Sequence, residues 1–110
     1  MSITTHVLDT ARGAPADGIP IRLDIADGDD WREVASGRTN ADGRIADFMT
    51  TDLQAATYRM TFDTAAYFSK RQIEGFYPKV EVTFVIREPA QHYHVPLLLS
   101  PFGYSTYRGS

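Results

Sequence analysis

Hydrophobic and polar residues alternate along most of this chain with a period of two, which is typical of β-strands that bury one face. The clearest run is VEVTFVI at residues 80–86, where every second side chain is apolar. Runs of this kind predict strands at residues 3–9, 20–25, 31–38, 44–48, 57–63, 80–87, 91–99 and 103–108.

Stretches rich in glycine, proline, aspartate and asparagine separate these runs, for example RGAPADG, TNADG and SPFG. Residues 64–72 predict one short helix, with Asp63 as N-cap and with Lys70 and Arg71 in the last turn. Eight short strands with a turn signal about every 8–12 residues predict an all-β fold. We therefore expect a single antiparallel β-sandwich domain over residues 1–110.

Two of the predicted strands carry apolar side chains on both faces. Residues 91–99 have a regular core face, yet their opposite face combines His92 and His94 with Leu98. Residues 3–9 show the same mixture on one face, with Thr4, His6 and Leu8. Two interpretations stay open: isolated exposed leucines, or an interface between copies of the chain that also carries polar groups.

The amino-acid composition argues against several classes of binding partner. The 110 residues are 43% hydrophobic and 12% aromatic, which suffices for a buried core, and the net charge of −3 argues against nucleic acid as a main partner. There is no cysteine, which excludes disulfides and thiolate chemistry. No apolar run is long enough to cross a bilayer and the first residues lack signal-peptide features, so we expect no membrane partner and a cytoplasmic location.

Histidine and arginine are the candidate chemical groups. His92 and His94 point the same way on a strand and have a spacing that suits a metal, but no third ligand is evident, so we expect neither metal nor cofactor. His6 and His94 would form an acid–base pair if the sheet brought them together. Arg44, directly after the turn TNADG, is by itself an ordinary charge at the start of a strand.

Three segments resemble the transthyretin-related family, and more narrowly its 5-hydroxyisourate hydrolase branch. They are THVLDTARGAPADGIPIRL at residues 5–23, ADGRI at 41–45 and HYHVPLLLSPFGYSTYRGS at 92–110. The last four residues, YRGS, are the most specific part, because the carrier branch of the family lacks them. The LLSP and YST segments occur in both branches and therefore indicate the fold alone.

The resemblance implies a homotetramer, built as a dimer of dimers, with a channel between the dimers. It implies a site with His6, Arg44, His94 and Tyr107 contributed by the first, fourth, seventh and eighth strands of one sheet. The last three residues, Arg108, Gly109 and Ser110, would close the pocket. Ser110 would add a hydroxyl and its α-carboxylate, which would orient a histidine or pair with an arginine.

The resemblance also implies a reaction: hydrolysis of 5-hydroxyisourate to 2-oxo-4-hydroxy-4-carboxy-5-ureidoimidazoline in urate degradation. His6 and His94 would activate water and carry protons, Arg44 would stabilise the oxyanion, and Tyr107 would hold the substrate ring. Which histidine acts as the base stays open. Three alternatives remain: a transthyretin-like carrier of a small ligand without catalysis, a structural sandwich domain, and a metal-dependent variant of the hydrolase.

Overall fold

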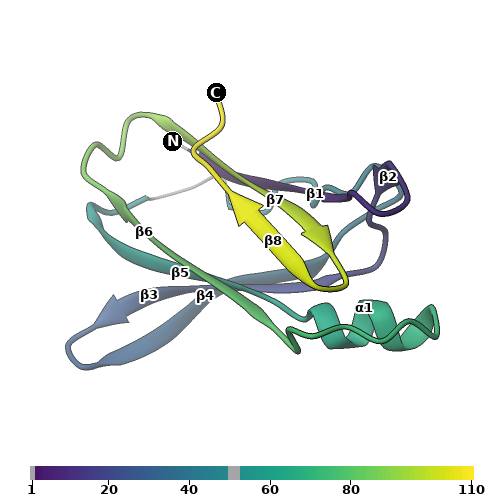
Figure 1. Cartoon of the computed structure of the whole chain (residues 1–110). Coiled ribbons are helices and arrows are strands. Elements are labelled where there is room, and N and C mark those ends of the chain that lie inside the picture. The colour runs from purple at the N-terminus through teal and green to yellow at the C-terminus, as the bar shows by residue number, and fades with distance from the viewer. Residues whose placement is uncertain (1, 50–52) are drawn as a thin grey trace.

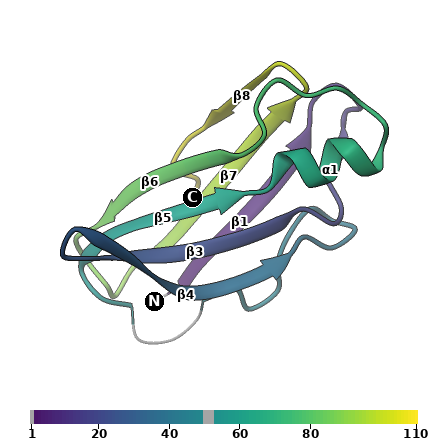
Figure 2. The same ribbon diagram turned by 90° about the horizontal axis from the view of Figure 1, so that it is seen from below.

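The computed structural model describes residues 2–49 and 53–110, which form two four-stranded β-sheets packed face to face (Figure 1). Seen from below, the strands of the two sheets cross at an angle, and the helix α1 lies at one end of the sandwich (Figure 2). The predicted β-sandwich of about eight strands with one short helix is therefore confirmed. Within the described residues, no helix has the length and apolar character needed to cross a membrane.

The first sheet has the strand order β2-β1-β7-β8. Its strands are β1 (Ser2–Asp9), β2 (Ala14–Pro15), β7 (His92–Ser100) and β8 (Gly103–Thr106). β1 and β7 run parallel, in contrast to the expected antiparallel pairing, and place Ser2 opposite His92 and Thr4 opposite His94. A parallel pair needs a crossover connection, and here the whole second sheet provides it.

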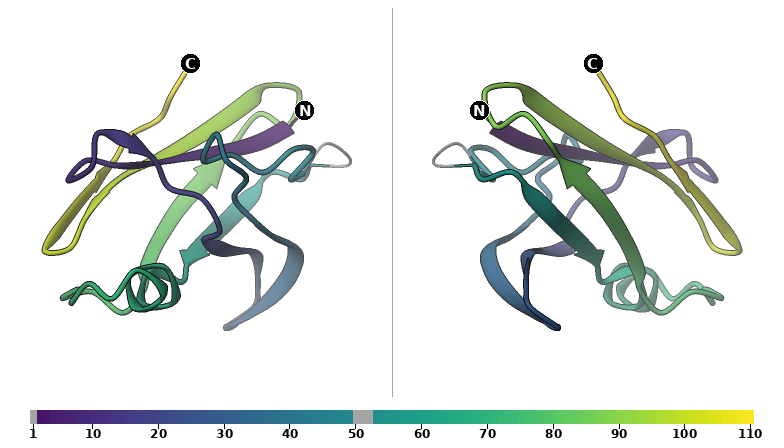
Figure 3. Two further views of the ribbon diagram at one scale, coloured as in Figure 1. Left: turned by 90° about the vertical axis from the view of Figure 1, so that its right-hand side faces the viewer. Right: turned by 90° about the vertical axis from the view of Figure 1, so that its left-hand side faces the viewer.

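The second sheet has the order β4-β3-β5-β6 and is antiparallel throughout. Its strands are β3 (Pro20–Asp27), β4 (Asp30–Arg38), β5 (Ala56–Phe62) and β6 (Val80–Ile86). The alternating apolar side chains of both sheets meet between the layers, where Ile3, Leu23, Met60, Phe62 and Leu97 are fully buried. Figure 3 shows the two layers splayed apart in an end-on view. The buried apolar side chains form one core cluster.

Helix α1 (Thr64–Lys70) is shorter than predicted. Asp63 is its N-cap, as expected, and accepts a hydrogen bond from the N–H of Ala66 over 3.0 Å. The helix ends before Gln72, which adopts a positive φ of 59°. On its buried side, the hydroxyl of Tyr67 donates to Asp9 Oδ2 over 2.7 Å and thereby joins the helix to the end of β1.

The strand predicted at residues 44–48 is wrong. The chain there makes only two isolated bridges to β1, His6 to Arg44 and Ile3 to Met49, with a turn between them. Asp47 lies in that turn with a positive φ of 53°, which a regular strand does not accommodate. The two-residue β2 was not predicted, because so short a strand carries no periodic signal.

Candidate functional site

Strand alternation places a polar row on the outer face of the first sheet. Ile3, Thr5 and Val7 of β1 are buried, so Thr4 and His6 face outward and are half-buried. In β7 the same alternation turns His92 and His94 to that face. The outward face predicted from the sequence pattern is therefore confirmed, and it carries the three histidines of the chain.

A tight turn delivers Arg44 to this face. The side-chain oxygen of Asn40 accepts hydrogen bonds from the N–H groups of Asp42 and Arg44, over 2.9 and 3.1 Å. Gly43 has a φ of +75°, and a Cβ at this position would lie 2.4 Å from the carbonyl oxygen of Val7. Only glycine allows this conformation and this close approach. Arg44 consequently lies beside His6 at the edge of β1.

The segment after β8 continues along β7 in the same register. Gly109 pairs with His94 and donates its N–H to the carbonyl of His94 over 2.8 Å. Between β8 and this bridge the ladder is interrupted at Pro96, which has no N–H and whose carbonyl accepts from the hydroxyl of Thr106 over 2.7 Å. The tail rises from the first sheet on the side away from the second (Figures 1 and 3), and it carries Ser110 to the site.

A hollow of ≈ 480 Å³ lies where these segments meet. It is lined by Thr4, Thr5, Asn40, Arg44, Ile45, Ala46, Asp47, His92, His94 and Ser110. Three of the predicted site residues, Arg44, His94 and Ser110, are thus brought together from distant parts of the sequence. A permanent cation, an imidazole and hydroxyl groups around one hollow suit the binding and hydrolysis of a small polar molecule.

The other two predicted residues lie next to this hollow and do not line it. His6 packs close to Gly43, where a Cβ would lie 3.2 Å from its ring carbon Cδ2. Tyr107 is 58% exposed and lines a neighbouring hollow of ≈ 250 Å³. His94 lines both hollows and therefore lies between Tyr107 and Arg44.

Burial and neighbouring positive charge keep His94 neutral. Partial burial lowers the pKa of His94 below its usual value of 6.5, and the charge of Arg44 lowers the same pKa further. His92 and His6 act in the same direction. A neutral imidazole at neutral pH accepts a proton from water, which is the property that a general base requires.

Hydroxyl groups contact the ring nitrogens of both β7 histidines. Thr4 Oγ1 lies 2.8 Å from Nδ1 of His94 and 3.3 Å from Nε2 of His92, and Ser2 Oγ hydrogen-bonds Nδ1 of His92. The two imidazoles are nearly parallel, with ring centres 6.4 Å apart. Over residues 2–49 and 53–110, no three His, Cys, Asp or Glu side chains are grouped so as to hold a metal ion.

Arg108 does not line the hollow beside Arg44, contrary to expectation, but it lines the neighbouring hollow together with Tyr107. Its guanidinium stacks over the ring of Tyr93, 4.6 Å from the ring centre, and donates to the side-chain oxygen of Gln91 over 3.0 Å. Arg108 therefore anchors the tail, while Ser110 reaches the hollow.

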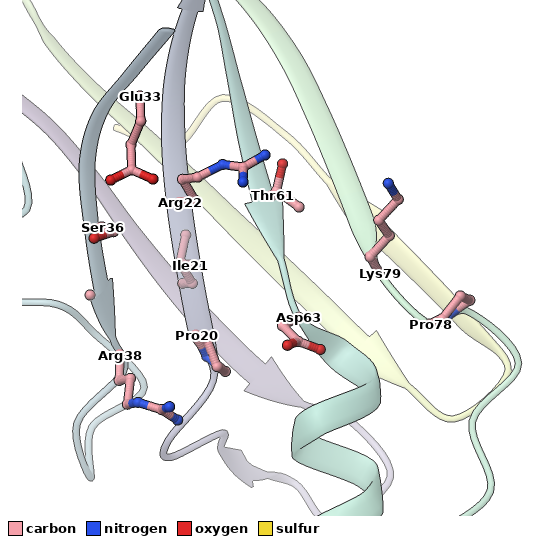
Figure 4. Close-up of a pocket in the computed structure, with 11 residues that line it drawn as sticks. Pro20, Ile21, Arg22, Glu33, Ser36, Arg38, Thr61, Asp63, Pro78 and Lys79 are labelled. Carbon is pink, nitrogen blue, oxygen red and sulfur yellow. The ribbon is translucent and has the colours of Figure 1, made fainter. Parts of the chain in front are cut away.

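A larger hollow of ≈ 660 Å³ lies on the outer face of the second sheet (Figure 4). The side chains around it include Arg22, Arg38 and Lys79 but, among the described residues that line it, no histidine. On this face Asp24 forms ion pairs with Arg22 and Arg59, over 3.2 and 3.1 Å. Lys79 in turn pairs with Glu81 over 3.8 Å. The hollow near His94 is the better candidate for catalysis, because it combines imidazoles with Arg44.

Thr4, Asn40 and Asp47 also line the His94 hollow, and the sequence alone did not single them out. Thr4 shares the alternation of His6, which is a signal for a shared face. Its approach to His94, however, depends on the parallel pairing of β1 with β7. Asn40 and Asp47 belong to turns, where their residue types are ordinary.

Comparisons with known proteins agree with this fold. A model of the HIUase/Transthyretin family matches residues 3–109. Over 111 residues, the chain is 50% identical to a probable 5-hydroxyisourate hydrolase of Caenorhabditis elegans, R09H10.3, covering 99% of this chain and 82% of the relative. The fold resembles Klebsiella pneumoniae 5-hydroxyisourate hydrolase, with a TM-score of 0.87 and 39% identity, covering 98% of each chain.

The fold also resembles a solved structure from the transthyretin side of the family. Sea bream transthyretin in complex with thyroxine has a TM-score of 0.92 and 34% identity, covering 97% of this chain and 93% of that one. The shared fold thus includes both a protein named as a hydrolase and a protein solved with a bound ligand. The chemistry of the site must distinguish the two functions.

Proposed function

Because the chain belongs to the HIUase/Transthyretin family, we propose that it is an enzyme that hydrolyses 5-hydroxyisourate in the hollow beside His94. Curated relatives that are 40–50% identical to nearly the whole chain are named 5-hydroxyisourate hydrolases, which supports the reaction. The observation that carries the proposal is that His94, with its lowered pKa, and Arg44 line one hollow.

The proposed reaction opens a cyclic amide with water. His94 accepts a proton from water while the oxygen attacks the ring carbonyl, and the negative charge develops on the carbonyl oxygen. Arg44 stabilises that oxyanion, because its guanidinium is permanently charged and offers several N–H donors. The carbon–nitrogen bond then breaks, the ring nitrogen takes up a proton, and 2-oxo-4-hydroxy-4-carboxy-5-ureidoimidazoline is formed.

The remaining predicted residues take supporting roles in this proposal. His6 lies next to Arg44 and supplies a second imidazole for proton transfer. Tyr107, in the hollow on the other side of His94, holds the substrate ring by stacking or through its hydroxyl. Ser110 lines the hollow with Arg44 and offers a hydroxyl to the bound substrate or water. The lowered pKa of His94 favours this residue over His6 as the base.

We further propose that the protein acts as a tetramer, a dimer of dimers, with the outer face of the first sheet turned toward a channel. This face carries Leu8 and Leu98 in half-buried positions beside the histidines. An assembled channel would bury these leucines and leave the polar groups around the substrate. Sedimentation equilibrium tests this assembly, because a monomer would overturn it.

A ligand carrier is the second candidate, because the chain resembles sea bream transthyretin in complex with thyroxine. An apolar channel suits a carrier, whereas Arg44 and His94 make this site polar and chargeable.

A spectrophotometric assay separates the two functions. Urate oxidase generates 5-hydroxyisourate, and its disappearance is followed with and without this protein. Faster decay supports the hydrolase. Decay at the spontaneous rate, together with saturable binding of an aromatic ligand, would support the carrier. Activity that is lost with a chelator and restored by a metal would instead support the metal-dependent variant.

A further inference from the structure

A continuous row of hydroxyl and imidazole groups runs across the outer face of the first sheet. From Ser2 Oγ it passes to Nδ1 of His92, from Nε2 of His92 to Thr4 Oγ1 over 3.3 Å, and from Thr4 Oγ1 to Nδ1 of His94 over 2.8 Å. The row exists because the parallel register of β1 and β7 sets Ser2 opposite His92 and Thr4 opposite His94. Thr4, His92 and His94 of this row line the hollow, and the row ends at Ser2 beside the exposed His92.

This row has two complete hydrogen-bonding arrangements. A hydroxyl donates one bond and also accepts, and a neutral imidazole has one N–H and one acceptor nitrogen. In the first arrangement, Nδ1–H of His94 donates to Thr4, Thr4 donates to Nε2 of His92, and Nδ1–H of His92 donates to Ser2. In the second, every bond is reversed. The first leaves Nε2 of His94 free to accept a proton, and the second leaves it protonated.

We propose that Thr4 is a positioning residue that sets the tautomer of His94 and relays a proton between His94 and His92. This inference rests on the proposed hydrolysis. As Nε2 of His94 accepts a proton from water, its Nδ1 proton moves to Thr4. The proton of Thr4 moves to Nε2 of His92, and His92 gives up its Nδ1 proton to Ser2 or to solvent. The reverse sequence returns a proton to Nε2 of His94 for the leaving ring nitrogen.

Electrostatics gives this relay a function. Arg44, His6 and His92 all oppose a positive charge on His94. Among the described residues that line the hollow, Asp47 is the one with a carboxylate side chain, and the uncharged polar residues there are Thr4, Thr5, Asn40 and Ser110. An imidazolium at His94 is therefore costly, and a relay through Thr4 moves the added proton away from Arg44. His92 is exposed, so water solvates the charge there more readily than at half-buried His94.

Three variants test the role of the hydroxyl group. Thr4→Val keeps the shape of the side chain and removes the hydroxyl, so kcat is expected to fall about 10- to 100-fold with little change in KM. Thr4→Ser keeps the hydroxyl and is expected to restore most of the activity. Thr83→Val, on the exposed face of β6, is the matched control and is expected to behave like the wild type.

A double-variant comparison tests the relay itself. His92→Gln changes an exposed side chain, so its fold is not at risk, and it interrupts the row beyond Thr4. If the two residues act in one relay, the Thr4→Val/His92→Gln double variant loses no more activity than Thr4→Val alone. Independent, multiplicative losses would overturn the relay, as would wild-type kcat in Thr4→Val.

A measurement without substrate separates this inference from the proposed function. The ¹⁵N chemical shifts of the imidazoles report the tautomer and the titration of each histidine. In the wild type we expect one tautomer of His94 to predominate, because its Nδ1 hydrogen-bonds Thr4, and in Thr4→Val we expect a mixture of both tautomers. Unchanged His94 shifts in Thr4→Val would overturn the inference. A His94 tautomer that changes in Thr4→Val, when the wild-type protein does not hydrolyse 5-hydroxyisourate, would support the row and refute the hydrolase.

Discussion

Gly109 lies directly against the ring of His94. Its N–H donates to the carbonyl of His94 over 2.8 Å, and a Cβ on Gly109 would lie 2.5 Å from His94 Cδ2. Contacts this short do not occur for real side chains, so any residue larger than glycine must displace the imidazole or the tail. Gly109 of the YRGS segment is thus tied physically to the orientation of the proposed base.

The first prediction concerns this contact. Gly109→Ala is expected to lower kcat about 100-fold, because misplacing a catalytic group by about 1 Å has a cost of this size. Thermal stability should change little, since the tail lies outside the core. Gly103→Ala is the control, because its Cβ would meet Ser100 Oγ at an ordinary 3.7 Å. Equal activities of the two variants in the decay assay would contradict the prediction.

The pH dependence follows from His94. Because the pKa of His94 in the folded protein is below 6.5, the neutral form of His94 predominates at and above this pH. The acid limb of the kcat/KM profile is therefore expected to have its midpoint below pH 6.5. The unfolded chain binds more protons in this window, so stability is also expected to fall as the pH decreases from 6.5. A midpoint above pH 6.5 would argue against His94 as the base.

Arg44 is expected to act on both the oxyanion and His94. Arg44→Gln removes a donor to the developing charge, which typically costs about 10²–10³ in kcat. It also removes one cause of the lowered pKa of His94, so the acid limb is expected to move up toward pH 6.5. Arg38→Gln, on the hollow of the second sheet, is the control (Figure 4). An unshifted limb in Arg44→Gln would show that the two groups are not coupled.

The buried contact between helix α1 and β1 is expected to stabilise the fold without affecting the site. Tyr67→Phe leaves one oxygen of Asp9, which is 1% exposed, without its hydroxyl donor. The free energy of unfolding is expected to fall by about 1–3 kcal/mol. Tyr104→Phe removes a hydroxyl from a 43% exposed side chain and should change little. Urea unfolding at one protein concentration measures both variants, and equal midpoints would contradict the prediction.

The fold was predictable from the sequence because alternation is clear in strands such as β1, β5 and β6 and because Asp63 gives the helix a clear start. The segment from Arg44 to Met49 was not predictable, since its apolar residues mimic a strand while Asp47 turns the backbone. The resemblance supplied His6, Arg44, His94, Tyr107 and Ser110 as a set. Alternation alone placed only His6 and His94 on outward faces.

Two features of the site depend on tertiary structure and produce no local pattern in the amino-acid sequence. The approach of Thr4 to His94 comes from a parallel pairing between the two ends of the chain, which periodicity does not encode. The separation of Arg108 from Ser110 comes from the stacking of Arg108 on Tyr93, a contact between residues 15 positions apart. A sequence motif such as YRGS therefore identifies candidate site residues but does not give the direction of each side chain.

The most direct test of the central claim is the decay of 5-hydroxyisourate with wild-type protein and with His94→Asn. Asparagine retains a polar side chain but not the acid–base chemistry of an imidazole. The circular dichroism spectrum and the oligomeric state of the His94→Asn variant should match those of the wild type. We expect wild-type protein to accelerate the decay and His94→Asn to lower kcat about 10²–10⁴-fold. Wild-type turnover by a folded His94→Asn variant would contradict the account.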